Sequence, residues 1–243
     1  MFWRETKGLA GIPLASKLAI TAVLIVAGVG YLLGFTNIYL SYSPVDQKPG
    51  LSLQDISLSF YGARGTTKLE KAIDGSMKQY FAGDADYQAV KGWLGKGAGE
   101  GDFPQVQPIL ESSCTSCHSA EAAVAGVITA SYADLKPLLA QDTGKSWPRL
   151  VALSHTHVLS TLAAIFILVF IFSFSRYPQV LKGIVMVFSV LAILVDVGSW
   201  WMAKLSPALA VLVLLGGLAL AVSFLALIVL SFVDLWFGKR EAS

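Results

Sequence analysis

Long apolar segments along this chain alternate with short polar turns and with one long polar stretch. Residues 18–35 carry no charged side chain, and residues 150–174, 183–203 and 207–237 are three further apolar segments separated by charged or proline-marked turns. A helix rises about 1.5 Å per residue, so segments of this length cross most or all of a hydrocarbon core of about 30 Å. The pattern predicts four transmembrane helices, with one extramembrane domain between the first two.

The polar stretch favours short helices. Leu69, Ile73 and Met77 recur at i, i+4 and i+8, which predicts a helix over residues 66–81. A second helix is predicted over residues 84–94, with Asp84 as its N-terminal cap and glycines after its end. The alanine-rich run AEAAVAGVITA is also helix-like. Residues 46–61 show mixed periodicity and are not assigned to an element.

These elements predict an all-α fold. A small, mainly helical extramembrane domain is inserted between the first and second of four transmembrane helices. The expected boundaries are residues 1–40 for the N-terminus and first span, residues 41–147 for the outer domain, and residues 148–243 for a three-helix transmembrane domain.

Composition agrees with a membrane protein. The chain is 55% hydrophobic and 14% charged, with a mean hydropathy of +0.64, which excludes an ordinary soluble globular protein. A net charge of +2 is too small to indicate a basic surface that binds nucleic acid. The lipid bilayer is therefore the expected environment, and no nucleic-acid partner is expected.

Basic residues near the spans predict their orientation. Seven lie at one end of the spans: Arg4, Lys7, Lys17, Arg176, Lys182, Lys239 and Arg240. Only Arg149 and Lys204 lie at the opposite membrane edge, together with Trp147, Trp200 and Trp201. Because cytoplasmic loops carry the excess of Lys and Arg, both termini are expected in the cytoplasm. The expected location of the chain is then a bacterial inner membrane, with the outer domain in the periplasm.

The outer domain contains both cysteines of the chain in one short motif. Cys114 and Cys117 are spaced C-x-x-C, and His118 follows directly. In this motif the two thiols add across the vinyl groups of one haem, and the histidine becomes the proximal iron ligand. The motif predicts one covalent haem c. The alternatives are a disulfide or redox C-x-x-C, and a zinc site that would need further ligands.

The sixth iron ligand has more than one candidate. Between His118 and the second span there is no methionine, and Met77 is the only methionine of the outer domain. Met77 is therefore the first candidate, and a core methionine is the alternative. His155 and His157, near the outer end of the second span, are the other candidates. At i and i+2 they point to roughly opposite helix faces, which disfavours a b-type haem held between them.

Asp196 is an ionisable residue inside the third span, at a depth comparable with that of the two span histidines. Ionisable residues within a membrane are costly and are candidates for function. Asp196 with His155 or His157 would form a proton-accepting pair suited to a quinol, which adds quinone as a second candidate cofactor. Interhelical hydrogen bonding between the two spans is the alternative.

Several stretches carry a family resemblance. The segment PILESSCTSCHS, with WLGKGA about twenty residues upstream, resembles the haem-binding part of planctomycete-type cytochrome c domains over Trp93 to Ser119. The segments DTGKSWPRLVALSHTHVLS and LVDVGSWWMAKL are similar to a four-span, uncharacterised proteobacterial membrane-cytochrome family. The resemblance implies a membrane-bound haem c and no particular substrate.

The expected function is single-electron transfer at the periplasmic face by a membrane-anchored monohaem cytochrome c. Such a chain is an electron-transfer protein or subunit rather than a stand-alone enzyme. Its expected partners are other membrane redox subunits of a respiratory or quinol-linked complex, or a periplasmic electron carrier. Two alternatives stay open: a haem-based sensor or gas-binding protein, and a structural subunit whose C-x-x-C forms a disulfide.

Overall fold

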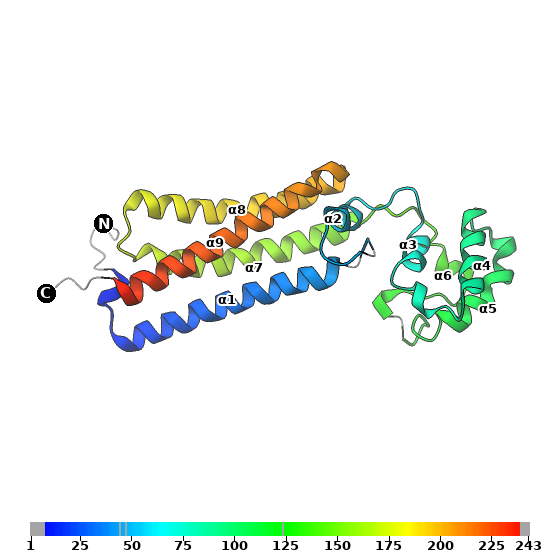
Figure 1. Cartoon of the computed structure of the whole chain (residues 1–243), viewed down its shortest axis with the longest axis horizontal. Helices are drawn as coiled ribbons and strands as arrows, with labels where there is room; N and C mark the ends of the chain where they lie inside the picture. The colour runs from blue at the N-terminus through cyan, green and yellow to red at the C-terminus, as the bar shows by residue number, and fades with distance from the viewer. Residues whose placement is uncertain (1–7, 44, 47, 123, 239–243) are drawn as a thin grey trace.

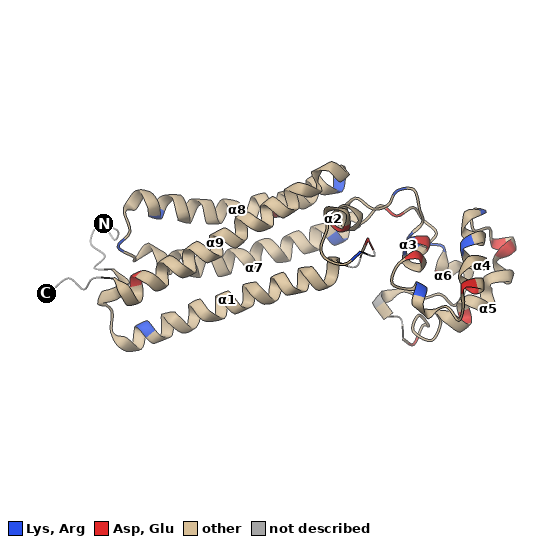
Figure 2. Cartoon of the chain, in the orientation of Figure 1, with Lys and Arg blue, Asp and Glu red and all other residues tan. Residues whose placement is uncertain are grey.

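The computed structural model of the chain describes residues 8–43, 45–46, 48–122 and 124–238. Four long helices lie along one another in an elongated bundle (Figure 1). A group of short helices lies beyond one end of this bundle, and the start of α1 and the end of α9 lie at the other. Charged residues are frequent in the short helices and sparse along the bundle (Figure 2). The predicted division into membrane helices and one polar domain therefore appears directly in the arrangement of the chain.

The four long helices confirm the predicted spans. Each is long and apolar enough to cross a membrane. They are α1 (Leu14–Tyr42), α7 (Trp147–Ser173), α8 (Gln179–Leu205) and α9 (Ala210–Phe237), the last preceded by the 3-10 turn η5 (Pro207–Leu209). With 29 residues, α1 is about 44 Å long and extends past the predicted apolar segment, residues 18–35, at both ends.

The bundle has a core built mainly by α7, α8 and α9. Phe172, Ile193 and Leu227 are among its buried side chains, whereas α1 buries only Lys17 and Leu24. Helix α1 therefore packs at the side of a three-helix unit and leaves most of its apolar surface for lipid.

Polar contacts join the helices at the bundle end where α1 starts and α9 ends. A short turn, η1 (Leu9–Gly11), lies there, and its Leu9 N–H donates to Asp234 Oδ2 at 2.8 Å. Asp234 Oδ1 lies 3.3 Å from Arg176 Nε. Lys17 donates to the Leu235 carbonyl, at 2.9 Å. Three of the seven basic residues counted at this end are described; Arg4, Lys7, Lys239 and Arg240 lie outside the described residues.

The outer helices form a small domain with its own core. Val90, Trp93 and Leu110 are buried at its centre, and the Trp93 indole N–H donates to the Gly99 carbonyl at 3.0 Å. The elements are α3 (Lys68–Asp74), η2 (Lys78–Tyr80), α4 (Asp84–Gly95), η3 (Glu100–Asp102), α5 (Phe103–Ser113), η4 (Val124–Gly126) and α6 (Tyr132–Leu135). The described residues contain no β-strand, in agreement with the predicted all-α class.

Three local predictions need correction. The helix predicted over residues 66–81 ends at Asp74, because Gly75 leaves the helical conformation; only the turn η2 follows. Asp84 is the first helical residue of α4 and does not cap it, since Gly83 holds the cap position. In the alanine-rich run, the described residues form only η4, which ends where Gly126 adopts a positive φ of 70°.

The segment left unassigned contains α2 (Leu53–Phe60). Ser52 accepts from the Asp55 N–H, and the Asp55 carboxylate accepts from the Ser52 N–H, so the two residues form a capping box. Ile56 and Phe60 of α2 pack with residues of α7, α8 and α9. The helix therefore lies on the outer end of the bundle, inside the stretch that the sequence assigned to the outer domain.

Two connectors form a neck between the bundle and the outer domain. The first comprises residues 61–67 and the second comprises residues 139–146. They run antiparallel and meet at an isolated bridge between Thr67 and Gln141. Because the chain crosses the neck only twice, contacts between the connectors decide how firmly the outer domain is held.

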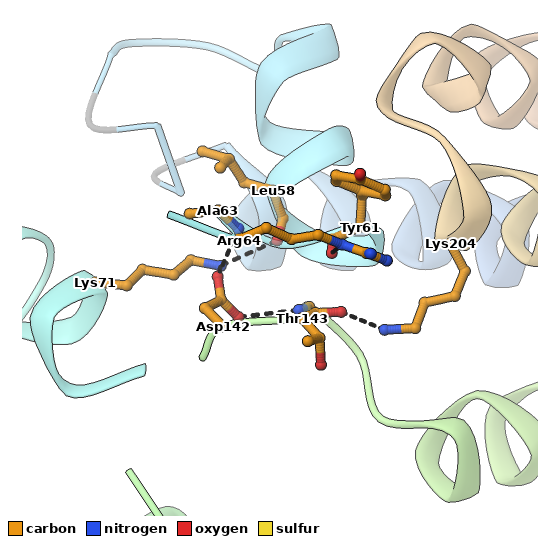
Figure 3. A network of polar contacts seen from close by, with 9 residues as sticks. Leu58, Tyr61, Ala63, Arg64, Lys71, Asp142, Thr143 and Lys204 are labelled. Carbon is orange, nitrogen blue, oxygen red and sulfur yellow. Dashed lines mark hydrogen bonds and ion pairs between the residues drawn. The ribbon is translucent and has the colours of Figure 1, made fainter. Parts of the chain in front are cut away.

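A buried carboxylate clamps the neck (Figure 3). Asp142 is 5% exposed, and its oxygens accept from the N–H groups of Ala63 and Gly144, both at 2.9 Å. Lys71 Nζ lies 2.9 Å from Asp142 Oδ2. Lys204, near the end of α8, donates to the carbonyl of the residue after Asp142. The clamp thus joins both connectors, an outer helix and a membrane helix.

Two glycines allow the connectors to approach. Gly62 and Gly144 have φ values of +88° and +67°, in the left-handed region. A Cβ atom at Gly62 would collide with the backbone at Gly144, and one at Gly144 would collide with the Phe60 carbonyl. Both positions therefore require glycine for conformation and for space.

We expect Asp142→Asn to weaken the neck. The amide keeps the size of the side chain but loses the ion pair with Lys71, so the free energy of unfolding should fall by roughly 1–3 kcal/mol. Thermal unfolding and protease cleavage within the connectors would measure this. Asp84→Asn, at an exposed position in α4, is the matched control and should stay within about 0.5 kcal/mol of the parent.

The clamp should also loosen in acid. Burial of Asp142 opposes its ionisation, but hydrogen bonds from two backbone N–H groups and from Lys71 outweigh burial and hold the pKa of its carboxyl below the ordinary value. Its stabilising contribution is therefore complete above about pH 4 and is lost as the pH falls through the lowered pKa. Connector cleavage that shows the same pH dependence in the parent and in Asp142→Asn would contradict this role.

Candidate functional site

The C-x-x-C-H motif lies in a turn directly after α5. The N–H groups of Cys117 and His118 both donate to the Cys114 carbonyl, at 3.1 and 2.9 Å. Helix α5 ends at Ser113, and Cys114 holds its C-terminal cap position outside the helical conformation. The turn therefore brings both thiols and the imidazole into one short segment at the end of α5.

The segment after the motif folds back and holds His118 in place. The Thr129 N–H donates to the His118 carbonyl at 2.9 Å, and His118 Nδ1 lies 3.3 Å from the Val127 carbonyl oxygen. A carbonyl can only accept, so we assign the proton of the neutral ring to Nδ1. Nε2 then carries the lone pair that a metal-ligating histidine needs.

The two thiols differ in their surroundings. Cys114 is half-buried and packs against the core of the outer domain, whereas Cys117 is exposed. Burial raises the pKa of the Cys114 thiol. Both cysteines are free. One end of the motif is thus anchored in the domain core, and the other end is open to solvent.

This donor set fits a haem c. Two free thiols and an imidazole with an available Nε2 are the groups that hold covalent haem, and they follow one another on a single turn. Beside them, Thr129 is 4% exposed, and its hydroxyl is buried without a hydrogen-bond partner. An unpartnered buried hydroxyl next to a ligand set indicates room for a further polar group. No motif in the sequence marks Thr129.

Met77, the first candidate for the sixth ligand, lies at the start of η2. Its N–H donates to the Ala72 carbonyl at 3.1 Å. Leu69 and Ile73, predicted to share its face, are buried in the domain core, whereas Met77 is half-buried and outside that core. The helix break at Gly75 accounts for the difference. The role of Met77 as a ligand stays a prediction.

The structure brings one of the two span histidines to Asp196. His157 Nε2 lies 3.3 Å from Asp196 Oδ2, and the His157 ring packs on the Trp200 ring with 4.9 Å between centroids. His155 is exposed on α7. Both histidines belong to the bundle, on the opposite side of the neck from α5 (Figure 1). The pair that forms is therefore His157 with Asp196.

A close helix crossing surrounds this pair. A Cβ atom at Gly216 of α9 would lie 2.7 Å from the Asp196 Cα, so only glycine fits there. The neighbouring Gly217 accepts from the Tyr31 hydroxyl of α1 at 3.4 Å. Side chains or backbone of all four membrane helices therefore meet near Asp196. Sequence reasoning missed Gly216 because a glycine in an apolar helix does not reveal which neighbour it contacts.

Comparison with known proteins adds one finding. Residues 142–242 match the model of a family described as a transmembrane helical domain. This transmembrane helical domain begins at Asp142 in the neck and contains the His157–Asp196 pair, but it excludes the C-x-x-C-H motif. No curated protein and no solved structure matches the chain. The match agrees with the three-helix membrane unit and does not extend to the outer domain.

Different burial of the two thiols gives a labelling prediction. In the protein without haem, iodoacetamide at pH 8 should modify Cys117 several-fold faster than Cys114. Cys114 is half-buried, and its raised pKa leaves less of its thiol ionised. Mass spectrometry of the peptide containing both residues would resolve the two rates. Equal rates, or faster reaction at Cys114, would contradict the packing of Cys114 against the core.

Proposed function

We propose that this chain is a membrane-anchored, monohaem c-type cytochrome that carries single electrons at the outer face of a bacterial inner membrane. The observation that carries the proposal is the single turn that contains Cys114, Cys117 and His118, with Nδ1 of the histidine 3.3 Å from the Val127 carbonyl oxygen. Two free thiols alone would suit several chemistries. The adjacent, oriented imidazole favours haem over a simple dithiol.

Each residue has a defined part. Cys114 and Cys117 would hold the haem through two thioethers, formed by addition of their S–H groups across its vinyl double bonds, which needs no external oxidant. Nε2 of His118 would be the proximal iron ligand, and the hydrogen bond from Nδ1 to the Val127 carbonyl fixes the ring and increases its basicity. Haem supplies the one-electron chemistry when bound. Met77 remains the proposed sixth ligand.

The orientation and the partners belong to the same proposal. The described basic residues Lys17, Arg176 and Lys182 gather at the bundle end opposite the outer domain, which supports a cytoplasmic position for that end. The outer domain would then be periplasmic, where covalent haem is attached. Its electron partners would be other membrane redox subunits or a periplasmic carrier.

Denatured protein should keep its haem only if the motif is intact. We expect a pyridine haemochrome spectrum from the full-length chain, and its loss in a Cys114→Ala, Cys117→Ala double variant, because thioethers survive denaturation. His118→Ala should shift the spectrum of the folded protein. Ser112→Ala, at an exposed position of α5, is the control and should keep the parent spectrum.

The outcomes separate the alternatives. A chain that lacks covalent haem and shows a Cys114–Cys117 disulfide would contradict the proposal and leave a structural subunit. Covalent haem whose reduced spectrum changes strongly with carbon monoxide would indicate an open sixth position and favour a gas-binding sensor over an electron carrier.

A further inference from the structure

The His157–Asp196 pair is an ionisable site inside the membrane bundle that haem attachment does not use. Asp196 is 5% exposed and lies about 14 Å along α8 from the outer end of that helix. His157 lies about 15 Å along α7 from Trp147 at the outer end of that helix. The two residues therefore sit at matching depth, below the outer membrane surface. Ionisable residues at such depth are costly to keep and mark sites of transport or chemistry.

The pair has an unmet hydrogen-bond requirement. His157 Nε2 is 3.3 Å from Asp196 Oδ2, but the contact lacks the alignment of a hydrogen bond, and Nε2 is buried without a hydrogen-bond partner. Buried polar atoms in folded proteins nearly always have partners, so an exception points to a group that binds there. A hydroxyl between an imidazole nitrogen and a carboxylate would satisfy both.

Aromatic rings border the pair on its outer side. Trp200 packs on His157, and Phe60 of α2 lies 6.2 Å from the Trp200 ring. Trp201 donates to the Ser154 hydroxyl one turn away on α7, at 3.0 Å. An aromatic surface therefore borders the polar pair on one side, which suits a ligand with a planar ring and a hydroxyl group.

We propose that the His157–Asp196 pair binds one hydroxyl of a membrane hydroquinone and accepts its proton as the electrons leave for the outer domain. The inference rests on the proposed cytochrome function for the electron acceptor. Both O–H bonds of the hydroquinone break, which yields the quinone, two protons and two electrons. Nε2 of His157 takes the proton of the hydroxyl bound at the pair, the Asp196 carboxylate stabilises the resulting imidazolium, and the proton of the second hydroxyl passes to water. The two electrons would pass one at a time through the haem c of the proposed function to an oxidised one-electron carrier at the outer face.

The proposal is tested with the full-length, haem-loaded protein in detergent and with decylubiquinone as the probe. Binding is measured by quenching of tryptophan fluorescence, and haem reduction by decylubiquinol is followed anaerobically. We expect His157→Gln and Asp196→Asn each to weaken binding and slow reduction about tenfold or more, the effect of losing a hydrogen bond to a charged group. Thr156→Val, at an exposed position beside His157, is the control and should stay within about twofold.

Two further measurements keep the outcomes distinct. Dithionite should reduce the haem equally in every variant, which shows that the haem site is intact. The double variant Cys114→Ala, Cys117→Ala should still bind decylubiquinone. Quinone binding therefore tests the His157–Asp196 pair even if the cytochrome proposal fails. If Asp196→Asn does not fold, His157→Gln decides, since this side chain is only partly buried.

Parent-like binding and reduction in His157→Gln would overturn the proposal. Lower thermal stability of both variants with unchanged quinone binding would also overturn it, because the pair would then serve only to hold α7 against α8.

Discussion

The hydrocarbon core of the membrane, which offers no hydrogen bonds, constrains where this chain can place charge. Lys182 lies near the start of α8 and donates to the carbonyls of Ser173 and Ser175. Lys204, near the end of the same helix, donates to the Thr143 carbonyl in the neck. Asp234, near the end of α9, accepts from the Leu9 N–H and lies beside Arg176. These charges lie near helix ends and have partners, because the hydrocarbon core offers none. Asp196 departs from that arrangement, and this departure supports the role proposed for its pair with His157.

The neck connects two modules, the membrane bundle and the outer domain. The outer domain has its own core and the bundle has another, and the chain passes between them only through the two connectors. The clamp around Asp142 ties these connectors to Lys71 of α3 and to Lys204 of α8. The clamp would thus hold a redox group of the outer domain at a fixed distance from the membrane, which a flexible linker would not do.

The membrane fold was predictable from sequence because length and hydropathy alone decide whether a helix can span a bilayer. The candidate site residues Cys114, Cys117 and His118 could likewise be named from their spacing alone. The sequence also held the signal for α2, since Ser52 and Asp55 match a capping box, but mixed periodicity concealed it. In these cases the relevant information is local.

Other features depend on contacts between distant residues and could not be predicted. Periodicity extended the predicted helix through Gly75 to residue 81 because a single glycine gives only a weak penalty. The choice of His157 over His155 depends on the rotation of α7 against α8, which one sequence does not reveal. The collision that requires glycine at position 216 likewise exists only after α9 has packed on Asp196.

The proposed function depends on covalent attachment of haem to the turn after α5. Peptide mapping of the chain purified from bacterial membranes tests this attachment. We expect the peptide that contains Cys114 and Cys117 to carry the mass of one haem, with thioether bonds at both residues. Recovery of that peptide without haem, with its thiols free or joined in a disulfide, would contradict covalent attachment.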